Sequence, residues 1–243
     1  KPVVALYVGG SETGRQAGLS HTGSMSGPNE IYDGVFRQCG IIRATTITEL
    51  FDYALALGTL PRPGGNRVII LTHSGGPGAT AADSCGRAGL ALPQLSPETL
   101  DKLKPMIPRT ASTANPVDLT YNRDFAESFF DIPDVLLSEK DADMLLAYIL
   151  SPGSFADRIL KEMGVPEESI PLEREKLLKE HSRAFVSLTK RHPGKPIVGF
   201  TYRSLQETMV RYLIDRGVPV YQDPERAARS IAAVLQYYHQ RDR

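Results

Sequence analysis

The sequence of 243 residues has no tryptophan, only two cysteines and no excess of charge of either sign. Cys39 and Cys85 are too few for a disulfide framework and both fall in helix-like segments, which favours a reducing cytoplasm. The 28 lysines and arginines equal the 28 aspartates and glutamates, which argues against a nucleic-acid-binding protein. No apolar run approaches the roughly 18 residues that span a bilayer, and no secretory signal is recognisable. We therefore expect a cytoplasmic protein without membrane or nucleic-acid partners.

The first residues form an apolar run, PVVALYV, directly after Lys1 and without a methionine. Such a continuous run is typical of a strand in a parallel sheet that is covered on both faces. Since a chain rarely begins with a buried strand, we expect the sequence to be the ordered part of a longer protein or a subunit fragment. A processed terminus is the alternative.

Strands and helices are predicted to alternate after this start. Strands are expected within 2–8, 41–44, 67–72, 143–151, 196–200 and 218–221. Helices are expected over 28–39, from Thr46, after Ser74, from Ser96, over 172–191, around 205–213 and from Asp223. The segment 9–27, rich in glycine and hydroxyl groups, is predicted to be a loop, and PRPGG (61–65) is the clearest linker. This alternation implies a parallel sheet with helices on both faces.

The turn SGGPG follows the predicted strand RVIILT. Glycines without side chains let backbone N–H groups approach an anion, and the alanine-rich helix that follows would direct its positive end to the same point. Ligands of parallel sheets collect beyond the carboxyl ends of the strands. We therefore predict a phosphate-binding site formed by Ser74, Gly75, Gly76 and Gly78. A tight strand-to-helix turn without a ligand is the alternative.

This turn matches neither of the two common nucleotide motifs. It lacks the Gly-Lys-Ser/Thr of a Walker A loop and the spacing of GxGxxG, so the turn alone does not predict a nucleotide. His73, which directly precedes the turn, is expected to be a polar residue at the end of the strand rather than a ligand-binding residue.

His21 lies in the segment LSHTGS, among small polar residues. A histidine in such a segment can be a solvated surface residue, a metal ligand or a nucleophile that accepts a phosphoryl group. No cysteine or histidine stands at ligand spacing, so no metal site is predicted. Ser20, Thr22 and Gly23 are small enough for a phosphate dianion to approach the imidazole. Composition alone leaves the surface residue and the nucleophile both open.

The stretch SHTGSMSGPNEIYDGVFRQCGIIRATTITELFD resembles the phosphohistidine segment of ADP-forming (NDP-forming) acyl-CoA synthetases and, more distantly, that of succinyl-CoA synthetase. NRVIILTHSGGPGATAAD and TANPVDLT resemble the family's glycine turn and its Asn-Pro-Val-Asp motif. The resemblance covers essentially the whole chain, and the specific motifs precede residue 120. It implies an α/β fold, with a flavodoxin-like parallel sheet over 63–243. The C-terminal part of a second, similar domain, which carries the phosphohistidine loop, would precede it over 1–62.

Members of this family are acid–thiol ligases that convert acyl-CoA, ADP and phosphate to a free acid, CoA and ATP. The resemblance implies that His21 accepts the phosphoryl group and that its loop carries the group to the nucleotide site. The SGGPG turn would be one of two helix N-termini that clamp the phosphate. Ser20, Thr22 and Gly23 would support the loop. CoA and ATP/ADP with Mg²⁺ would be the cofactors of the complete enzyme, and this chain alone would bind none of them fully.

The resemblance also implies partners: a CoA-binding domain, an ATP-grasp domain or subunit, acyl-CoA and phosphate, in an oligomer. Asn115 and Asp118 of ANPVDLT either support the phosphate site or cap the turn in which they stand. The competing function is a non-catalytic ligand-sensing module, such as the ligase-like domains that are fused to acetyltransferases.

Overall fold

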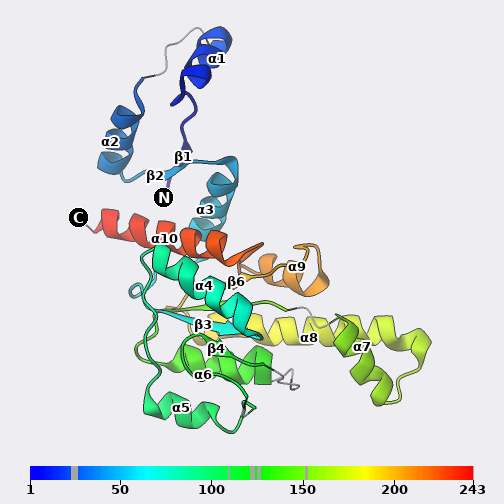
Figure 1. Cartoon of the computed structure of the whole chain (residues 1–243). Coiled ribbons are helices and arrows are strands. Elements are labelled where there is room, and N and C mark those ends of the chain that lie inside the picture. The colour runs from blue at the N-terminus through cyan, green and yellow to red at the C-terminus, as the bar shows by residue number, and fades with distance from the viewer. Residues whose placement is uncertain (23–26, 109, 121–123, 125–126, 151–152, 243) are drawn as a thin grey trace. The chain divides into compact units, whose positions relative to one another are not determined.

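The computed structural model describes residues 1–22, 27–108, 110–120, 124, 127–150 and 153–242, and for His21, Thr22, Ser154 and Phe155 it describes only the backbone. The chain divides into two compact units (Figure 1). The first unit comprises residues 1–58 together with 230–243, and the second comprises residues 59–229. The boundary at residues 58 and 59 lies close to the PRPGG linker.

The first unit contains a short parallel sheet, in which β1 (Val4–Leu6) pairs with β2 (Ile42–Ala44). Its helices are α1 (Glu12–Thr22), α2 (Asn29–Cys39) and α3 (Ile47–Thr59). The last helix of the chain, α10 (Pro224–Arg241), belongs to this unit from Ser230 onward. The core of this unit consists of Ile42, Ala44, Tyr53 and Ala233, against which Val4, Leu6, Leu50, Leu57 and Tyr237 pack.

The ends of α2 and α3 follow from their sequences as predicted. Gly40 ends α2 in the left-handed conformation, with φ of 67°, which glycine adopts without steric cost. At the start of α3 the Glu49 N–H donates to Thr46 Oγ1 at 3.1 Å, while the Glu49 carboxylate accepts from the Thr45 N–H at 2.7 Å. In α3, Ala54 is exposed and Tyr53 is buried.

The prediction of a loop over 9–27 is wrong for residues 12–22, which form α1. Ser11 starts this helix, because its Oγ accepts the Gly14 N–H at 3.1 Å, and Glu12 pairs with Arg15 one turn later. The glycines dominated the sequence-based prediction, although single glycines cost a helix only about 1 kcal/mol each. His21 therefore lies in the last turn of a helix.

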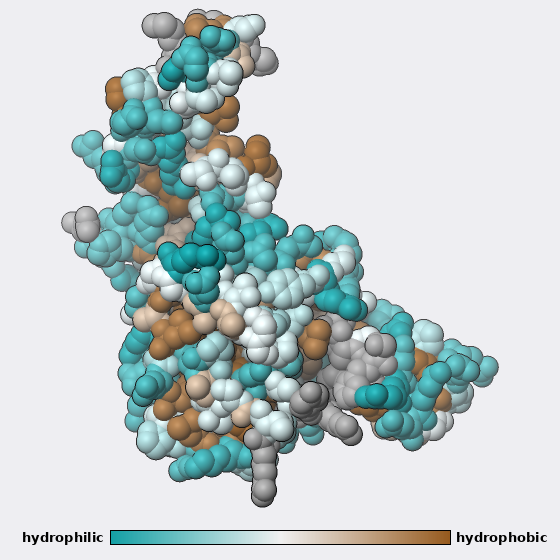
Figure 2. Space-filling model, viewed as in Figure 1, coloured by the Kyte–Doolittle hydropathy of each residue, from teal (hydrophilic) through white to brown (hydrophobic). Residues whose placement is uncertain are grey.

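Large hydrophobic side chains stand exposed mainly in the first unit. Seven of the eleven such side chains among the described residues lie within the first 51 residues, namely Val3, Val8, Leu19, Ile31, Val35, Ile47 and Phe51. Figure 2 shows brown surface over this part of the chain. Because a two-stranded sheet buries little apolar surface, this unit has only a small core of its own.

The second unit contains a five-stranded parallel sheet in the order β4-β3-β5-β6-β7. Its strands are β3 (Val68–Thr72), β4 (Val117–Asp118), β5 (Met144–Tyr148), β6 (Ile197–Phe200) and β7 (Val220–Tyr221). This order, with the second strand outside the first, is the flavodoxin-like arrangement. The sequence predicted four of these strands. It missed β4, which has only two residues and pairs at the edge of the sheet.

Helices surround this sheet, as the alternation predicted (Figure 1). They are α4 (Gly75–Arg87), α5 (Pro97–Leu103), the π-helix η1 (Glu127–Asp131), α6 (Ile132–Ser138), α7 (Gly153–Glu162), the short 3₁₀-helix η2 (Glu167–Ser169), α8 (Ile170–Arg191) and α9 (Thr208–Ile214). Ser96 caps α5 by accepting the Thr99 N–H, as predicted. The sequence did not predict η1, α6, α7 and η2.

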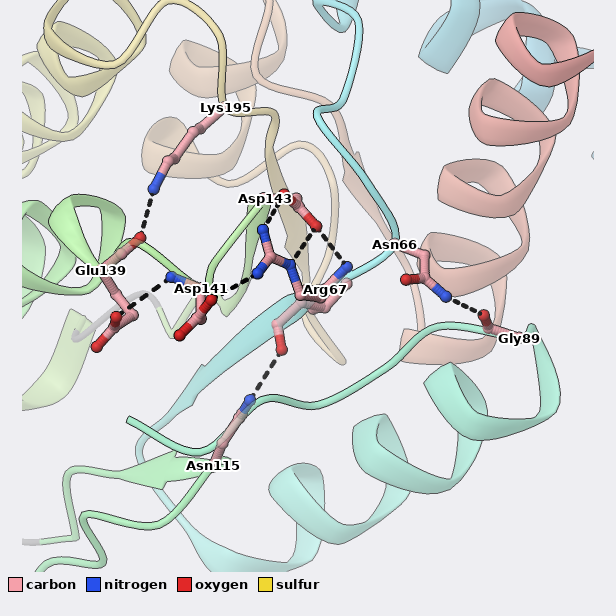
Figure 3. A network of polar contacts seen from close by, with 9 residues as sticks. Asn66, Arg67, Gly89, Asn115, Glu139, Asp141, Asp143 and Lys195 are labelled. Atoms are coloured by element: carbon pink, nitrogen blue, oxygen red, sulfur yellow. Dashed lines mark hydrogen bonds and ion pairs between the residues drawn. The ribbon is translucent and has the colours of Figure 1, made fainter. Parts of the chain in front are cut away.

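A polar network joins the starting ends of the strands in the second unit (Figure 3). The Arg67 guanidinium forms a bidentate pair with Asp143, with Nε and Nη2 each 3.0 Å from a carboxylate oxygen. The Arg67 N–H donates to the same carboxylate at 2.9 Å. A Cβ on Gly65 would lie 2.5 Å from Asp143 Oδ2, so the linker passes this carboxylate with a glycine. The network thereby fixes where β3 and β5 begin.

Two further residues extend this network to α5 and β6. The Glu139 carboxylate accepts the Ser96 N–H at 2.8 Å, and Lys195 Nζ donates to the Glu139 carbonyl at 2.6 Å. Burial alone would raise the pKa of Glu139, but hydrogen bonds from Ser96, Thr99 and the Asp141 backbone hold it at about 2. Burial would likewise raise the pKa of Asp143, and the hydrogen bonds from Arg67 keep it below its usual value. Both groups are thus carboxylates at neutral pH.

Replacing Asp143 by asparagine is expected to lower the free energy of unfolding at pH 7 by about 1–3 kcal/mol, because the charged pair with Arg67 is lost. The folded pKa of Asp143 is depressed, so its contribution is present above its unfolded pKa of about 4 and is lost as the pH falls further. The difference between wild type and Asp143→Asn should therefore shrink below about pH 4. Urea unfolding of both proteins at pH 7 and at about pH 3.5 measures this difference in the free energy of unfolding.

The matched control is Asp141→Asn. Asp141 also contacts Arg67, at 2.7 Å, but its side chain is 67% exposed, so its loss should cost no more than about 0.5 kcal/mol. Equal losses in the two variants would contradict the central role of Asp143.

Candidate functional site

The SGGPG turn forms the exposed start of α4. Ser74 is its N-cap residue in extended conformation, and Ser74, Gly75 and Gly76 are all exposed. The first amides of a helix have no partner within the helix, so the N–H groups of Gly75 and Gly76 are available to a ligand in front of the helix. The Gly78 N–H instead donates to the Ser74 carbonyl at 3.3 Å. We call residues 74–76 the α4 tip.

Gly78 packs closely against the end of β3. A Cβ at this position would lie 3.2 Å from Thr72 Oγ1 and 3.5 Å from Pro116 Cβ, so the absence of a side chain lets α4 approach the end of β3 without a tight contact. Thr72 is fully buried beneath the helix, and its hydroxyl finds no hydrogen-bond partner within the described residues. This packing is a structural role of Gly78 that the sequence did not reveal, while its predicted part in phosphate binding stays a prediction.

The topology of the sheet places the α4 tip where a ligand would be expected. β3 has β4 on one side and β5 on the other, so the chain changes direction around β3. In such sheets the crevice beyond the carboxyl ends of the strands at this point is the usual binding place. The α4 tip follows the carboxyl end of β3 directly.

Asn115 is held in the fold by its amide. Its Nδ2 donates to the carbonyls of Val68, at 2.8 Å, and Pro93, at 3.1 Å, and its Oδ1 accepts the Ile70 N–H at 3.0 Å. The peptide bond between Asn115 and Pro116 is cis. The side chain of Asn115 therefore extends the pairing along β3 (Figure 3), which is a structural role beneath the site.

Asp118 lies closer to the α4 tip than Asn115 does. Its Oδ1 accepts the Thr120 N–H at 3.0 Å, the bond of an Asx turn. Its Oδ2 lies 3.7 Å from the position that a Cβ on Gly75 would take. Asp118 thus caps its own turn and at the same time brings a carboxylate beside the tip. The two roles that the sequence left open for Asp118 are compatible in this geometry.

His73, which directly precedes the α4 tip, lies beside the ring of Phe129. Its ring centroid lies 6.1 Å from that of Phe129. Burial lowers the pKa of His73 to about 4, although the nearby Asp118 carboxylate raises it. The imidazole is therefore neutral at physiological pH and adds no positive charge to the tip.

His21 is placed by the backbone of α1, next to the exposed Ser20. The side chains of His21 and Thr22 are not described, and Gly23 lies outside the described residues. The α4 tip belongs to the second unit and His21 to the first. The role of His21 and its loop thus stays a prediction.

In the part of the chain that the structure describes, no cluster of three or more histidine, cysteine, aspartate or glutamate residues is arranged to hold a metal ion. None of the described helices combines the length and apolarity needed to cross a membrane.

Comparisons with known proteins agree with this fold. Residues 1–57 match the family model described as succinyl-CoA ligase like flavodoxin domain. The chain is 33% identical, over 97% of its length and 48% of the relative's, to the acetate–CoA ligase [ADP-forming] II subunit alpha of Pyrococcus furiosus. It is 29% identical to the 4-hydroxybutyrate–CoA ligase [ADP-forming] of Nitrosopumilus maritimus, covering 98% of this chain and 31% of that one.

A solved structure shows the same relationship. The chain aligns over its whole length, with 27% identity and a TM-score of 0.77, to 48% of the dinucleotide forming acetyl-coenzyme A synthetase 1 of Ca. Korarchaeum cryptofilum, determined in complex with phosphate and ADP. The chain thus spans about half the length of these relatives or less. By sequence and by fold, the chain is thus similar to about half of the ADP-forming acetate–CoA ligases, and its first 57 residues match a succinyl-CoA ligase like flavodoxin domain.

Proposed function

We propose that this chain is the phosphohistidine-bearing portion of an ADP-forming acyl-CoA synthetase, an acid–thiol ligase. In the complete enzyme, acyl-CoA and phosphate give an acyl phosphate and CoA. The neutral imidazole of His21 then attacks phosphorus, and the carboxylate leaves as the free acid. The observation that carries this proposal is the exposed, glycine-lined α4 tip at the carboxyl edge of a flavodoxin-like sheet, in a homologue of these ligases.

The phosphate site is assigned to Ser74, Gly75 and Gly76, with Gly78 behind them. The N–H groups of the α4 tip and the positive end of the helix favour an anion. The Asp118 carboxylate beside Gly75 opposes a dianion at the same point. Asp118 therefore acts as an orienting residue that keeps the phosphate on the Gly76 side of the tip.

The exposed apolar side chains of the first unit support its assignment as part of a larger domain. We assign residues 1–62 to the C-terminal part of a first ligase domain and residues 63–243 to a second one. Apolar side chains of α2 and α3, such as Ile31, Val35 and Phe51, are exposed in this chain. Parallel sheets are covered on both faces, so further strands and helices of the first ligase domain would bury these side chains.

The proposed partners supply the parts of the complete enzyme that would bind CoA and the nucleotide. We assign CoA to a CoA-binding domain, and ATP/ADP with its Mg²⁺ to an ATP-grasp domain or subunit, in an oligomeric cytoplasmic enzyme. Ser20, Thr22 and Gly23 support the histidine, and their small size leaves room for the phosphoryl group. The ligand-sensing alternative has no observation in its favour, because the relatives named above are ligases.

Labelling tests the role of His21. The complete enzyme given ATP with a radiolabelled γ-phosphate is expected to gain an acid-labile, base-stable phosphate on His21. His21→Ala should abolish both this label and the formation of ATP from acyl-CoA, ADP and phosphate. His239→Ala, at an exposed histidine of α10, should leave both unchanged. If the His21→Ala enzyme still took up label and still formed ATP, His21 would be ruled out as the residue that carries the phosphoryl group.

The matched pair Gly76→Ala and Gly86→Ala tests the α4 tip. Both glycines are exposed residues of α4, and an added Cβ meets nothing within 4 Å at either position. Both substitutions should therefore stabilise the helix by about 1 kcal/mol or less. Only Gly76→Ala is expected to raise the KM for phosphate, by about tenfold, because its methyl group stands where the anion approaches. Equal KM values for phosphate in the two variants would show that the α4 tip does not bind the phosphate.

A further inference from the structure

Five residues form one row across the carboxyl edge of the second unit's sheet. The strand register pairs Thr72 with Asp118, Tyr148 with Phe200, and Phe200 with Tyr221. Leu71 pairs with Ala147, so Thr72 and Tyr148 are the next residues of the two adjoining strands. Paired residues of parallel strands point to the same face of the sheet. Because Thr72 lies beneath Gly78, this whole row lies on the face that α4 covers.

The row changes in character from one side of the sheet to the other. Asp118 and Thr72 are polar and stand on the two strands next to the α4 tip, whereas Tyr148 and Phe200 are aromatic. Adjacent strands are about 4.8 Å apart, so the rings begin about 5 Å from β3 and continue to about 10 Å. If a ligand binds with its phosphate at the tip, the groups next to that phosphate would therefore lie near these aromatic residues.

The wall consists of three rings in contact, Tyr148, Phe200 and Tyr202. Tyr148 stacks on Phe200 with centroids 5.1 Å apart and an interplanar angle of 27°. Tyr202 lies against both, at 5.6 Å from Tyr148 and 6.1 Å from Phe200. Phe200 is fully buried, Tyr148 is 9% exposed and Tyr202 is 52% exposed. The two inner rings therefore hold the outer ring in place, and the outer ring faces solvent.

This exposure is unusual in the second unit. Among its described residues, the other exposed large hydrophobic side chains are Leu150, Met163 and Leu172. Leu150 follows β5 as Tyr202 follows β6, so two of the four stand at the same edge of the sheet. A ring fixed by its neighbours offers a flat face at little entropic cost, and such faces favour planar ligand groups in offset stacking.

We propose that Tyr148, Phe200 and Tyr202 form a stacking wall for a planar ring of the ligand whose phosphate or acyl group lies at the α4 tip. The proposal rests on the proposed function, because the tip locates the reacting end of the ligand. Two sources could supply the ring: an aryl group of the acid, or the adenine of CoA. Tyr202 is then a specificity-determining residue, while Tyr148 and Phe200 position it.

Direct binding to the full-length protein with its partner domains tests the wall without requiring turnover. Calorimetry would compare acetyl-CoA, benzoyl-CoA and the corresponding acetyl- and benzoyl-pantetheine thioesters, which lack adenine. With an aryl acid as the source, Tyr202→Ala should weaken binding of both benzoyl thioesters by about three- to tenfold and change that of the acetyl thioesters by no more than about twofold. If adenine is the source, Tyr202→Ala should instead weaken the binding of acetyl-CoA and benzoyl-CoA by the same factor.

Two matched variants separate stacking from structure. Tyr202→Phe keeps the ring and should bind all four thioesters as the wild type does. Leu172→Ala, at an exposed residue of α8 that is 57% exposed, should also leave binding unchanged. Equal loss for all four thioesters in Tyr202→Ala, or no loss for any, would overturn the wall. A failure to label His21 would refute the proposed function and would leave these affinities as an independent result.

Discussion

The close approach of α4 to the end of β3 is the constraint on which the candidate site depends. Gly78 has no side chain, so the helix rests on Thr72 and Pro116 at a distance that a Cβ would barely tolerate. This contact directs the first turn of α4, with its exposed glycines, to the carboxyl edge of the sheet. It also buries the Thr72 hydroxyl in a place where no described residue accepts or donates to it. A buried hydroxyl without a partner is costly, so the contact is retained at the expense of stability.

The opposite edge of the same sheet carries the interactions that hold it together. Arg67, Asp143 and Lys195 stand just before β3, β5 and β6, and their bonds connect the places where these strands begin (Figure 3). Charged groups at this edge are satisfied by one another and by the backbone. At the carboxyl edge, the first N–H groups of α4 have no partner within the helix, and we propose that they bind the phosphate. In this proposal the two edges of the sheet have different roles, one in stability and the other in ligand binding.

The two units differ in how completely they bury their apolar residues. The second unit encloses a five-stranded sheet with a large core. The first unit has two short strands, and none of the residues of α2 is fully buried. This difference supports the proposal that the first unit is part of a larger domain. The outline of the fold was predictable because hydrophobic periodicity and turn residues act locally.

The sequence by itself determined the alternation of strands and helices, the glycine stop of α2, the caps of α3 and α5, and the exposed SGGPG turn, since each depends on neighbouring residues. It failed at α1, where isolated glycines suggested a loop, and at β4, a strand of only two residues that follows Asn115, whose side chain binds the backbone of β3. Only the tertiary structure decided that Asn115 supports the sheet while Asp118 reaches the tip. The row that runs from Asp118 to the aromatic wall also required the fold, because register joins residues that lie far apart in the chain.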